Sequence, residues 1–222
     1  MKRFVAIAGN IGVGKSTLTT LLSERLNWEP FFEAVNDNPY LADFYEDMQR
    51  WSFHSQIYFL SRRLRCHWQL LERANSVIQD RTVYEDAEVF ARNLYHQGLM
   101  NERDYRSYHE LYEVMTAVLA PPDLVVYLRA SIPTLQERIR HRGRSYEQGI
   151  STVYLEQLDV LYREWIEQFS SCPVLSVPSD DLDFVMNPHH LEMVTAKILA
   201  LCSKETKVEG WEEVTFEIDE KL

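Results

Sequence analysis

The sequence contains little cysteine. Its 222 residues include Cys66, Cys172 and Cys202, which lie far apart and form no C-x-x-C pair. Their odd number and spacing argue against a disulfide framework or a zinc site, because both need paired or closely grouped cysteines. Reduced thiols that serve as packing residues fit this pattern better, and we expect a cytoplasmic protein.

Long apolar runs and positive charge are scarce as well. No apolar run approaches the roughly 18 residues that span a bilayer, and the opening MKRFVAIAG turns into a loop motif before it could act as a signal segment. Against 34 Asp and Glu there are 23 Lys and Arg, for a formal net charge of -11. Because this charge repels polyanions outside a local basic site, we expect neither a membrane nor a nucleic acid as partner.

Apolar segments of strand and helix character alternate along the chain. This alternation predicts an α/β fold in which helices flank a central parallel sheet of about five strands. We assign one domain to residues 1–203 and an acid-rich tail to residues 204–222, and the sequence assigns no role to this tail. The expected strands lie in RFVAIAG, WEPFFEAV, NSVIQDR, PDLVVYLRA and CPVLSVP.

An amphipathic helix is predicted over residues 53–71. Its apolar residues recur at intervals of three, four and seven. Gln56 and Arg63 are seven residues apart and must share a face of this helix. Such polar residues are usually solvated, so the face matters only if it overlooks a site.

The motif GNIGVGKST indicates a phosphate-binding loop. An apolar strand precedes it and an amphipathic helix follows, as the motif requires. Lys15 is expected to reach the outer phosphates of ATP, and the Ser16 hydroxyl is expected to ligate Mg2+. The predicted ATP-binding residues of the loop are Gly9, Asn10, Ile11, Gly12, Val13, Gly14, Lys15, Ser16 and Thr17.

This loop alone leaves three classes open, namely a small-molecule kinase, a nucleotide switch and a mechanical or regulatory ATPase. The sequence has no N-K-x-D guanine signature and no D-x-x-G after the second strand, which argues against a GTPase-type switch.

Acidic and basic residues at the ends of two predicted strands favour the kinase. Glu33 follows the second strand, and Asp80 and Arg81 end the third. Since the carboxyl ends of parallel strands gather at the ligand crevice, all three should lie beside the phosphate loop. A carboxylate facing phosphates is unfavourable unless it accepts a proton from an attacking hydroxyl, which is the role we assign to Glu33. Asp80 would reach Mg2+ or its waters.

Three arginines predict a lid. Arg138, Arg142 and Arg144 surround Gly143 in an otherwise acidic chain, and such a cluster is costly unless an anion neutralises it. We expect a lid over about residues 138–149 that closes on the ATP phosphates and excludes water.

In their order along the chain, these motifs resemble deoxyribonucleoside kinases. GNIGVGKST, FFEAVNDNPYL, WSFHSQIYFLSRR, DRTVYED, RGRSYEQGI and DDLDFV all contribute, and YEDAEVFARNLYHQGLM resembles the bacterial purine members of the deoxycytidine, deoxyguanosine and deoxyadenosine kinase branch. The resemblance implies a P-loop kinase with an arginine-rich lid, which phosphorylates the 5′-hydroxyl of a deoxynucleoside with ATP and Mg2+ in nucleotide salvage. It also implies a homodimer.

The resemblance further implies roles for individual residues. Glu33 matches the general base, Arg81 the arginine that orients it, and Asp80 a position that usually holds Glu, so that contact with Mg2+ through water is expected more than direct contact. Tyr45 and Glu147 match the pair that binds the sugar 3′-hydroxyl.

Other matched positions concern the bases of the two substrates. Gln56 matches the residue that reads the base edge of the nucleoside, and Arg63 with Asp86 matches an ion pair that distinguishes this branch from thymidine-preferring relatives. Leu41, Trp51 and Phe90 match the apolar walls around sugar and base, and Asp183 with Phe184 matches the loop over the ATP base.

Ser55 is smaller than the aromatic residue of deoxycytidine kinases, which favours a purine such as deoxyadenosine or deoxyguanosine. A deoxycytidine-preferring or broad-specificity kinase is the alternative. A nucleoside-monophosphate kinase of thymidylate type and a non-enzymatic nucleotide switch are further alternatives.

Overall fold

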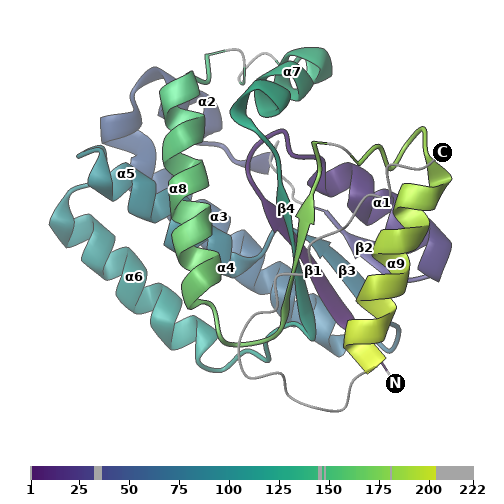
Figure 1. The fold of residues 1–222 in the computed structure, drawn as a ribbon. Helices are drawn as coiled ribbons and strands as arrows, with labels where there is room; N and C mark the ends of the chain where they lie inside the picture. Colours follow the sequence, from purple (N-terminus) through teal and green to yellow (C-terminus); the bar gives the residue numbers. More distant parts are fainter. Residues whose placement is uncertain (1, 33–36, 145–146, 148, 181, 204–222) are drawn as a thin grey trace.

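A computed structural model of the chain describes residues 2–32, 37–144, 147, 149–180 and 182–203 (Figure 1). Five strands form a single parallel sheet in the order β2-β3-β1-β4-β5. The predicted α/β fold is therefore confirmed. The strands are β1 (Phe4–Gly9), β2 (Glu29–Phe31), β3 (Val77–Asp80), β4 (Leu124–Arg129) and β5 (Val174–Pro178).

Helices cover both faces of the sheet (Figure 1). One face carries α1 (Lys15–Leu26) and α9 (Pro188–Ser203). The opposite face carries α3 (Met48–Glu72), α4 (Val83–Glu85), α6 (Glu102–Thr116) and α8 (Thr152–Gln168). The described chain also contains α2 (Leu41–Glu46), a π-helical segment η2 (Asp86–Ala91), α5 (Arg92–His96) and α7 (Ile132–Arg142).

The central strand β1 is buried from both sides. Because successive side chains of a strand point to opposite faces, Phe4 packs in the core beneath α3 and α8, whereas Val5 and Ile7 pack in the core beneath α1 and α9. An uninterrupted apolar run such as FVAIAG is what a strand buried on both faces requires.

Two elements differ in length from the sequence prediction. Strand β2 is shorter than the run WEPFFEAV, of which residues 33–36 lie outside the described part. It is an edge strand, a position that tolerates Pro30 because proline cannot donate a ladder hydrogen bond. Helix α3 begins five residues before the predicted start, where the Asp47 side chain accepts a hydrogen bond from the Arg50 amide.

The sheet order places the site. Strand β1 lies between β3 and β4. The chain adds β2 and β3 on one side of β1 and then β4 and β5 on the other side, so the strand order reverses at β1. In open parallel sheets, ligands bind at such a switch point. None of the helices in the described residues combines the length and apolar character that a membrane span requires.

Candidate functional site

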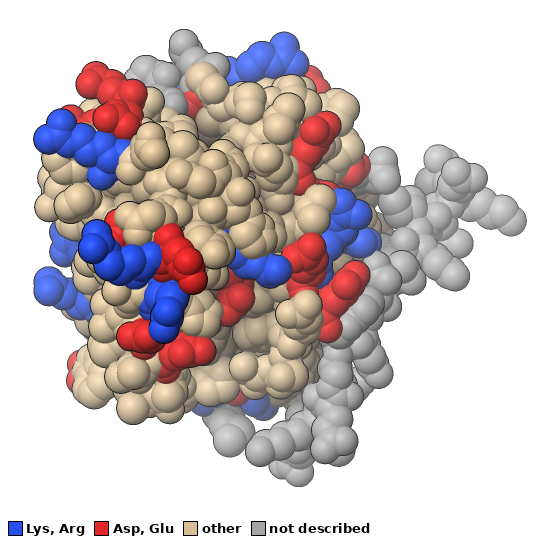
Figure 2. Space-filling model, turned by 90° about the vertical axis from the view of Figure 1, so that its left-hand side faces the viewer, with Lys and Arg blue, Asp and Glu red and all other residues tan. Residues whose placement is uncertain are grey.

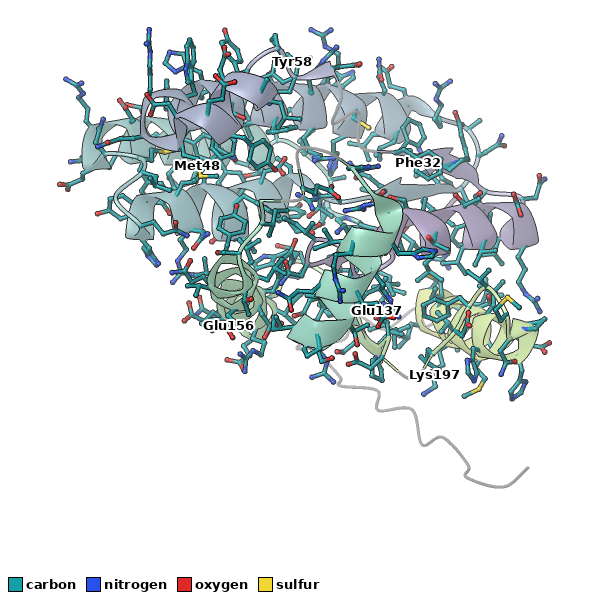
Figure 3. The ribbon with its side chains drawn as sticks, turned by 90° about the horizontal axis from the view of Figure 1, so that it is seen from above. Phe32, Met48, Tyr58, Glu137, Glu156 and Lys197 are labelled. Carbon is teal, nitrogen blue, oxygen red and sulfur yellow. The ribbon has the colours of Figure 1, made fainter. Side chains whose placement is uncertain are left out.

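A cleft of about 1100 Å³ opens at the carboxyl ends of β1 and β3. Figure 3 looks onto this end of the molecule, with Glu137 on α7 and Phe32 after β2 at separate places around the cleft. Most predicted site residues line it: Ile11, Gly12, Val13, Gly14, Lys15, Ser16, Thr17, Leu41, Tyr45, Gln56, Asp80, Arg81, Asp86, Phe90, Arg138, Arg142, Arg144, Glu147, Asp183 and Phe184.

The phosphate loop has the backbone shape that its glycines predict. Gly12 and Gly14 have φ values of 82° and 105°, in the region that favours glycine. At Gly12 a Cβ atom would also lie 2.9 Å from the Leu135 carbonyl oxygen of α7. Helix α1 begins directly after Gly14, at Lys15, so its positive end faces the cleft.

Lys15 is held at the root of the loop. Its Nζ donates hydrogen bonds to the carbonyl oxygens of Gly9 (2.7 Å) and Asn10 (2.9 Å). The Asn10 side chain braces the loop, because it donates to the Leu155 carbonyl oxygen and accepts from the Ile11 amide. Among the described residues, Gly9 and Asn10 support the loop from behind and are not part of the cleft lining.

Asp80 and Ser16 meet at the floor of the cleft. The Ser16 hydroxyl donates to Asp80 Oδ2 at 2.5 Å, and Asp80 is 3% exposed. The second oxygen, Oδ1, is buried without a hydrogen-bond partner among the described residues. A hydroxyl beside a buried carboxylate oxygen with spare acceptor capacity is a donor set suited to a hard divalent cation.

Arg81 is held in an unusual backbone conformation. Its φ is 69°, which is uncommon for a residue with a side chain and concentrates at functional sites. The Arg81 amide donates to the Ile7 carbonyl oxygen at 2.9 Å, which continues the pairing of β3 with β1. Its guanidinium lies 4.3 Å from the centre of the Phe90 ring, a cation–π contact between two residues that line the cleft.

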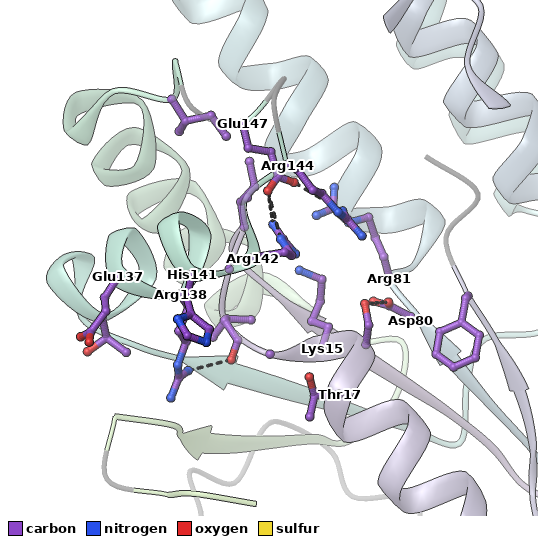
Figure 4. Close-up of a pocket in the computed structure, with 18 of the residues that line it drawn as sticks. Lys15, Thr17, Asp80, Arg81, Glu137, Arg138, His141, Arg142, Arg144 and Glu147 are labelled. Atoms are coloured by element: carbon purple, nitrogen blue, oxygen red, sulfur yellow. Dashed lines mark hydrogen bonds and ion pairs between the residues drawn. The ribbon is translucent and has the colours of Figure 1, made fainter. Parts of the chain in front are cut away.

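The lid arginines fall into two groups (Figure 4). Arg142 and Arg144 both bind the carboxylate of Glu147, at 2.7 Å and 3.4 Å. Arg138 lies within α7 and donates to the carbonyl oxygens of Val13 (3.0 Å) and Ser179 (2.6 Å). The structure therefore joins Glu147, which the resemblance assigns to the sugar, to two of the three arginines that it assigns to ATP. Arg138 is fixed to the phosphate loop.

A buried ion pair closes the opposite end of the cleft. Arg63 Nε donates to Asp86 Oδ2 at 3.0 Å, and the two residues are 6% and 3% exposed. Gln56 is also buried on α3, which places Gln56 and Arg63 on the inner face as the sevenfold spacing required. The Ser55 hydroxyl accepts from Asn38 Nδ2 at 3.1 Å.

Besides Gly9 and Asn10, two predicted residues of the described chain stand apart from the cleft lining. In the described residues, Trp51 packs with the rings of Tyr40 (5.7 Å) and His54 (5.3 Å) and does not line the cleft. Arg63 lies behind Asp86 and reaches the cleft through it. Glu33 lies outside the described residues.

The most important residue that the sequence analysis left unassigned is Glu85. It is completely buried and binds both the phosphate loop and the turn after Arg81. The T-x-x-E spacing of Thr82 and Glu85 is the signature of a capping box, which could have revealed it. Phe59 was also missed, although it follows Gln56 by three residues and therefore shares its helix face.

Comparison with known proteins gives the same result as the geometry. The family model described as deoxynucleoside kinase matches residues 5–203. The chain is 39% identical to the deoxyadenosine/deoxycytidine kinase of Bacillus subtilis, over 89% of this chain and 92% of that protein. It is 40% identical to the deoxyadenosine kinase of Dictyostelium discoideum, over 78% and 71% of the two chains.

A solved structure agrees as well. Deoxyadenosine kinase from M. mycoides, with the products dCMP and dCDP bound, superimposes with a TM-score of 0.79 at 34% identity. The match covers 89% of this chain and 99% of the other. The chain therefore belongs to the deoxynucleoside kinase family.

Proposed function

We propose that this deoxynucleoside kinase transfers the γ-phosphoryl group of ATP to the 5′-hydroxyl of deoxyadenosine, as a step of nucleotide salvage. One observation carries the proposal: a single cleft joins the phosphate loop and the lid arginines to the buried base-reading residues Gln56 and Asp86. Because the family transfers phosphate to a deoxynucleoside, the cationic end suits the donor and the opposite end suits the acceptor.

The chemistry that we assign to the cationic end is in-line transfer. The acceptor 5′-oxygen bonds to the γ-phosphorus, the bond from that phosphorus to the bridging oxygen breaks, and ADP leaves. Glu33 takes the hydroxyl proton, while Lys15, Arg81 and the loop amides stabilise charge on the transferring group. Phe32, the residue before Glu33, lines the cleft, which supports this placement of the base.

We assign Arg142, Arg144 and Glu147 to the two substrates jointly. Figure 4 shows their ion pairs close to Lys15 and Arg81. The arginines would bind the phosphates of ATP. Glu147 and Tyr45 would bind the 3′-hydroxyl of the sugar. Leu41 and Phe90 line the acceptor end, and Asp183 and Phe184 line the donor end, where we assign them to the ATP base.

Base preference rests on the Arg63–Asp86 pair. An ionised carboxylate only accepts hydrogen bonds, so Asp86 selects a base that offers an amino group at its edge. Adenine and cytosine both present one, whereas the corresponding atom of thymine is a carbonyl oxygen. Deoxycytidine is therefore the second candidate acceptor, which agrees with the name of the B. subtilis relative.

A panel assay tests this proposal. The four deoxynucleosides, adenosine, dAMP and dTMP are each supplied with ATP and Mg2+, and ADP release is followed. We expect deoxyadenosine to give the highest kcat/KM, deoxycytidine to be second, and adenosine to be poor. A higher kcat/KM for dAMP or dTMP than for any nucleoside would contradict the proposed acceptor.

We propose that Mg2+ is held by Ser16 and Asp80, directly or through water, where it would neutralise charge on the ATP phosphates. The unpartnered Oδ1 of Asp80 supports this assignment. Replacing Asp80 by asparagine removes the anionic ligand, and we expect the Mg2+ concentration for half-maximal rate to rise roughly 10–100-fold. The measurement is the initial rate against free Mg2+ at saturating substrates.

The matched control is Asp180→Asn, a second carboxylate beside the cleft that accepts hydrogen bonds from the Ser131 amide and hydroxyl. It should leave the Mg2+ requirement of the kinase where it was. If Asp80→Asn did the same, Asp80 would have no part in holding the ion.

We also propose a homodimer that packs through α6. Four apolar side chains on and just after this helix follow one another at intervals of three, one and three residues and are 38–74% exposed: Leu111, Val114, Met115 and Val118. They form a single stripe of the helix. Figure 2 shows the side of the molecule on which α5 and α6 lie, with an uncharged area among scattered charged side chains.

Charge on this stripe should separate the subunits. We expect Val114→Glu with Val118→Glu to halve the mass in solution, because two carboxylates would be buried against a second apolar stripe. Light scattering after gel filtration measures the mass, and Arg106→Glu is the control, since Arg106 is exposed away from the stripe. A parent mass of one chain would contradict the dimer.

We also propose a cytoplasmic location, which the free thiols Cys66, Cys172 and Cys202 fit.

A further inference from the structure

Glu85 is a buried carboxylate that none of the roles above uses. It ends the short helix α4 and is 0% exposed. Its partners are all donors: Oε1 accepts from the Gly9 amide (3.2 Å) and the Tyr162 hydroxyl (2.8 Å), and Oε2 accepts from the Thr82 amide (2.8 Å) and hydroxyl (3.3 Å). This set of donors matches an ionised carboxylate with both oxygens in use.

These partners come from three elements that build the active site. Gly9 ends β1 and begins the phosphate loop, and its carbonyl oxygen accepts from Lys15. Thr82 directly follows Arg81, whose φ of 69° orients the turn. Tyr162 lies on α8, which follows the lid, and its ring packs 6.3 Å from that of Phe90, over which Arg81 lies. Glu85 therefore connects the supports of both catalytic cations.

The charges of Glu85, Arg81 and Lys15 strengthen the connection between the phosphate loop and the turn after Arg81. Burial raises the pKa of Glu85, while the nearby positive charges of Arg81 and Lys15 oppose this rise. Two cations near a buried anion repel each other less, so they can both face the phosphates from fixed positions.

Helix capping alone does not account for this arrangement. In a capping box the glutamate needs to reach only the amide of the N-cap residue, which here is Thr82. Glu85 uses its other oxygen on the phosphate loop, 76 residues away in sequence. Burying a carboxylate is costly unless hydrogen-bond donors satisfy it. Here the donors come from both loops, so the carboxylate holds the two loops at one distance.

We propose that Glu85 is a positioning residue for phosphoryl transfer, which fixes the phosphate loop to the turn that presents Arg81. The role rests on the functions proposed above for Lys15 and Arg81. Glu85 does not touch either substrate; it sets the distance between the groups that do.

The test replaces Glu85 by glutamine, which keeps the shape but turns an amino group toward at least one N–H donor. We expect kcat to fall about 10–100-fold, as for other residues that orient catalytic groups, while the KM values for ATP and deoxyadenosine change less than about threefold. If this variant does not fold, Glu85→Asp keeps the charge but is too short to reach both amides, and the same split is expected.

Two controls separate positioning from stability. Asp123 accepts from the Phe4 amide (2.7 Å) at the opposite end of β1, so Asp123→Asn should lower the melting temperature without lowering kcat. Arg81→Met tests the underlying role, and the double variant with Glu85→Gln should lose less than the product of the single losses, because Glu85 acts through Arg81.

The outcomes are distinct. An unchanged kcat in Glu85→Gln, an equal kcat loss in Asp123→Asn, or multiplicative losses in the double variant would each overturn the positioning role. If Arg81→Met itself kept full kcat, the assignment of Arg81 would fail instead.

Discussion

Replacing Glu33 by glutamine is expected to lower kcat by about 10²–10⁴-fold, the range that general-base catalysis contributes. The amide cannot accept the proton of the 5′-hydroxyl, although it keeps the size of the side chain. ATP should still bind, because the phosphate loop and the lid arginines are untouched. Single-turnover kinetics with deoxyadenosine measures the loss, and calorimetry with ATP measures binding.

Glu137 provides the matched control for this variant. It is another glutamate at the cleft, on α7 beside Arg138, and has no assigned part in proton transfer. Glu137→Gln should keep kcat within about threefold of the parent value. If Glu33→Gln kept a near-normal kcat as well, the proton would have to be accepted elsewhere.

The parts of the site that lie within one short stretch could be predicted from the sequence. The phosphate loop needs only its glycines, Lys15 and the preceding strand, and these are local. Asp80 and Arg81 could be placed beside it because parallel strands end at one edge. Helix periodicity predicted that Gln56 and Arg63 share a face, which α3 buries, whereas their roles at the base came only from the resemblance.

Contacts between distant elements could not be predicted in this way. No spacing rule shows that Arg138 reaches back to the Val13 and Ser179 carbonyl oxygens, or that Glu147 pairs with the lid arginines. Such contacts depend on how α7 and the segment after it pack over the loop. The resemblance assigns Trp51 to the wall of the pocket, but its ring packs against Tyr40 and His54.

The π-helical segment η2 is a further feature that could not be predicted from the sequence. Within the described chain it runs from Asp86 to Ala91, between two short α-helical pieces, and it places Asp86 and Phe90 together on the cleft. Propensity scales do not distinguish π from α geometry, since the same residues favour both. Its place at the site agrees with the tendency of π segments to occur where function constrains a helix.

The Arg63–Asp86 pair carries the second large effect. Asp86→Ala alone should destabilise the fold by about 3–5 kcal/mol, because it removes a buried carboxylate that pairs with the Arg63 guanidinium. Replacing both residues, with Arg63→Met and Asp86→Leu, removes the charges together and should recover most of that stability. Thermal unfolding of the two variants measures this difference.

Only the double variant separates base choice from folding. Its kcat/KM for deoxyadenosine should fall by about 5–150-fold, because the base edge loses the Asp86 carboxylate as its partner, at ~1–3 kcal/mol. The value for thymidine should fall less, since thymine offers Asp86 no amino group at this edge. The ratio between the two nucleosides cancels general damage to the phosphate loop. An unchanged ratio in a folded double variant would mean that this pair supports the cleft without reading the base.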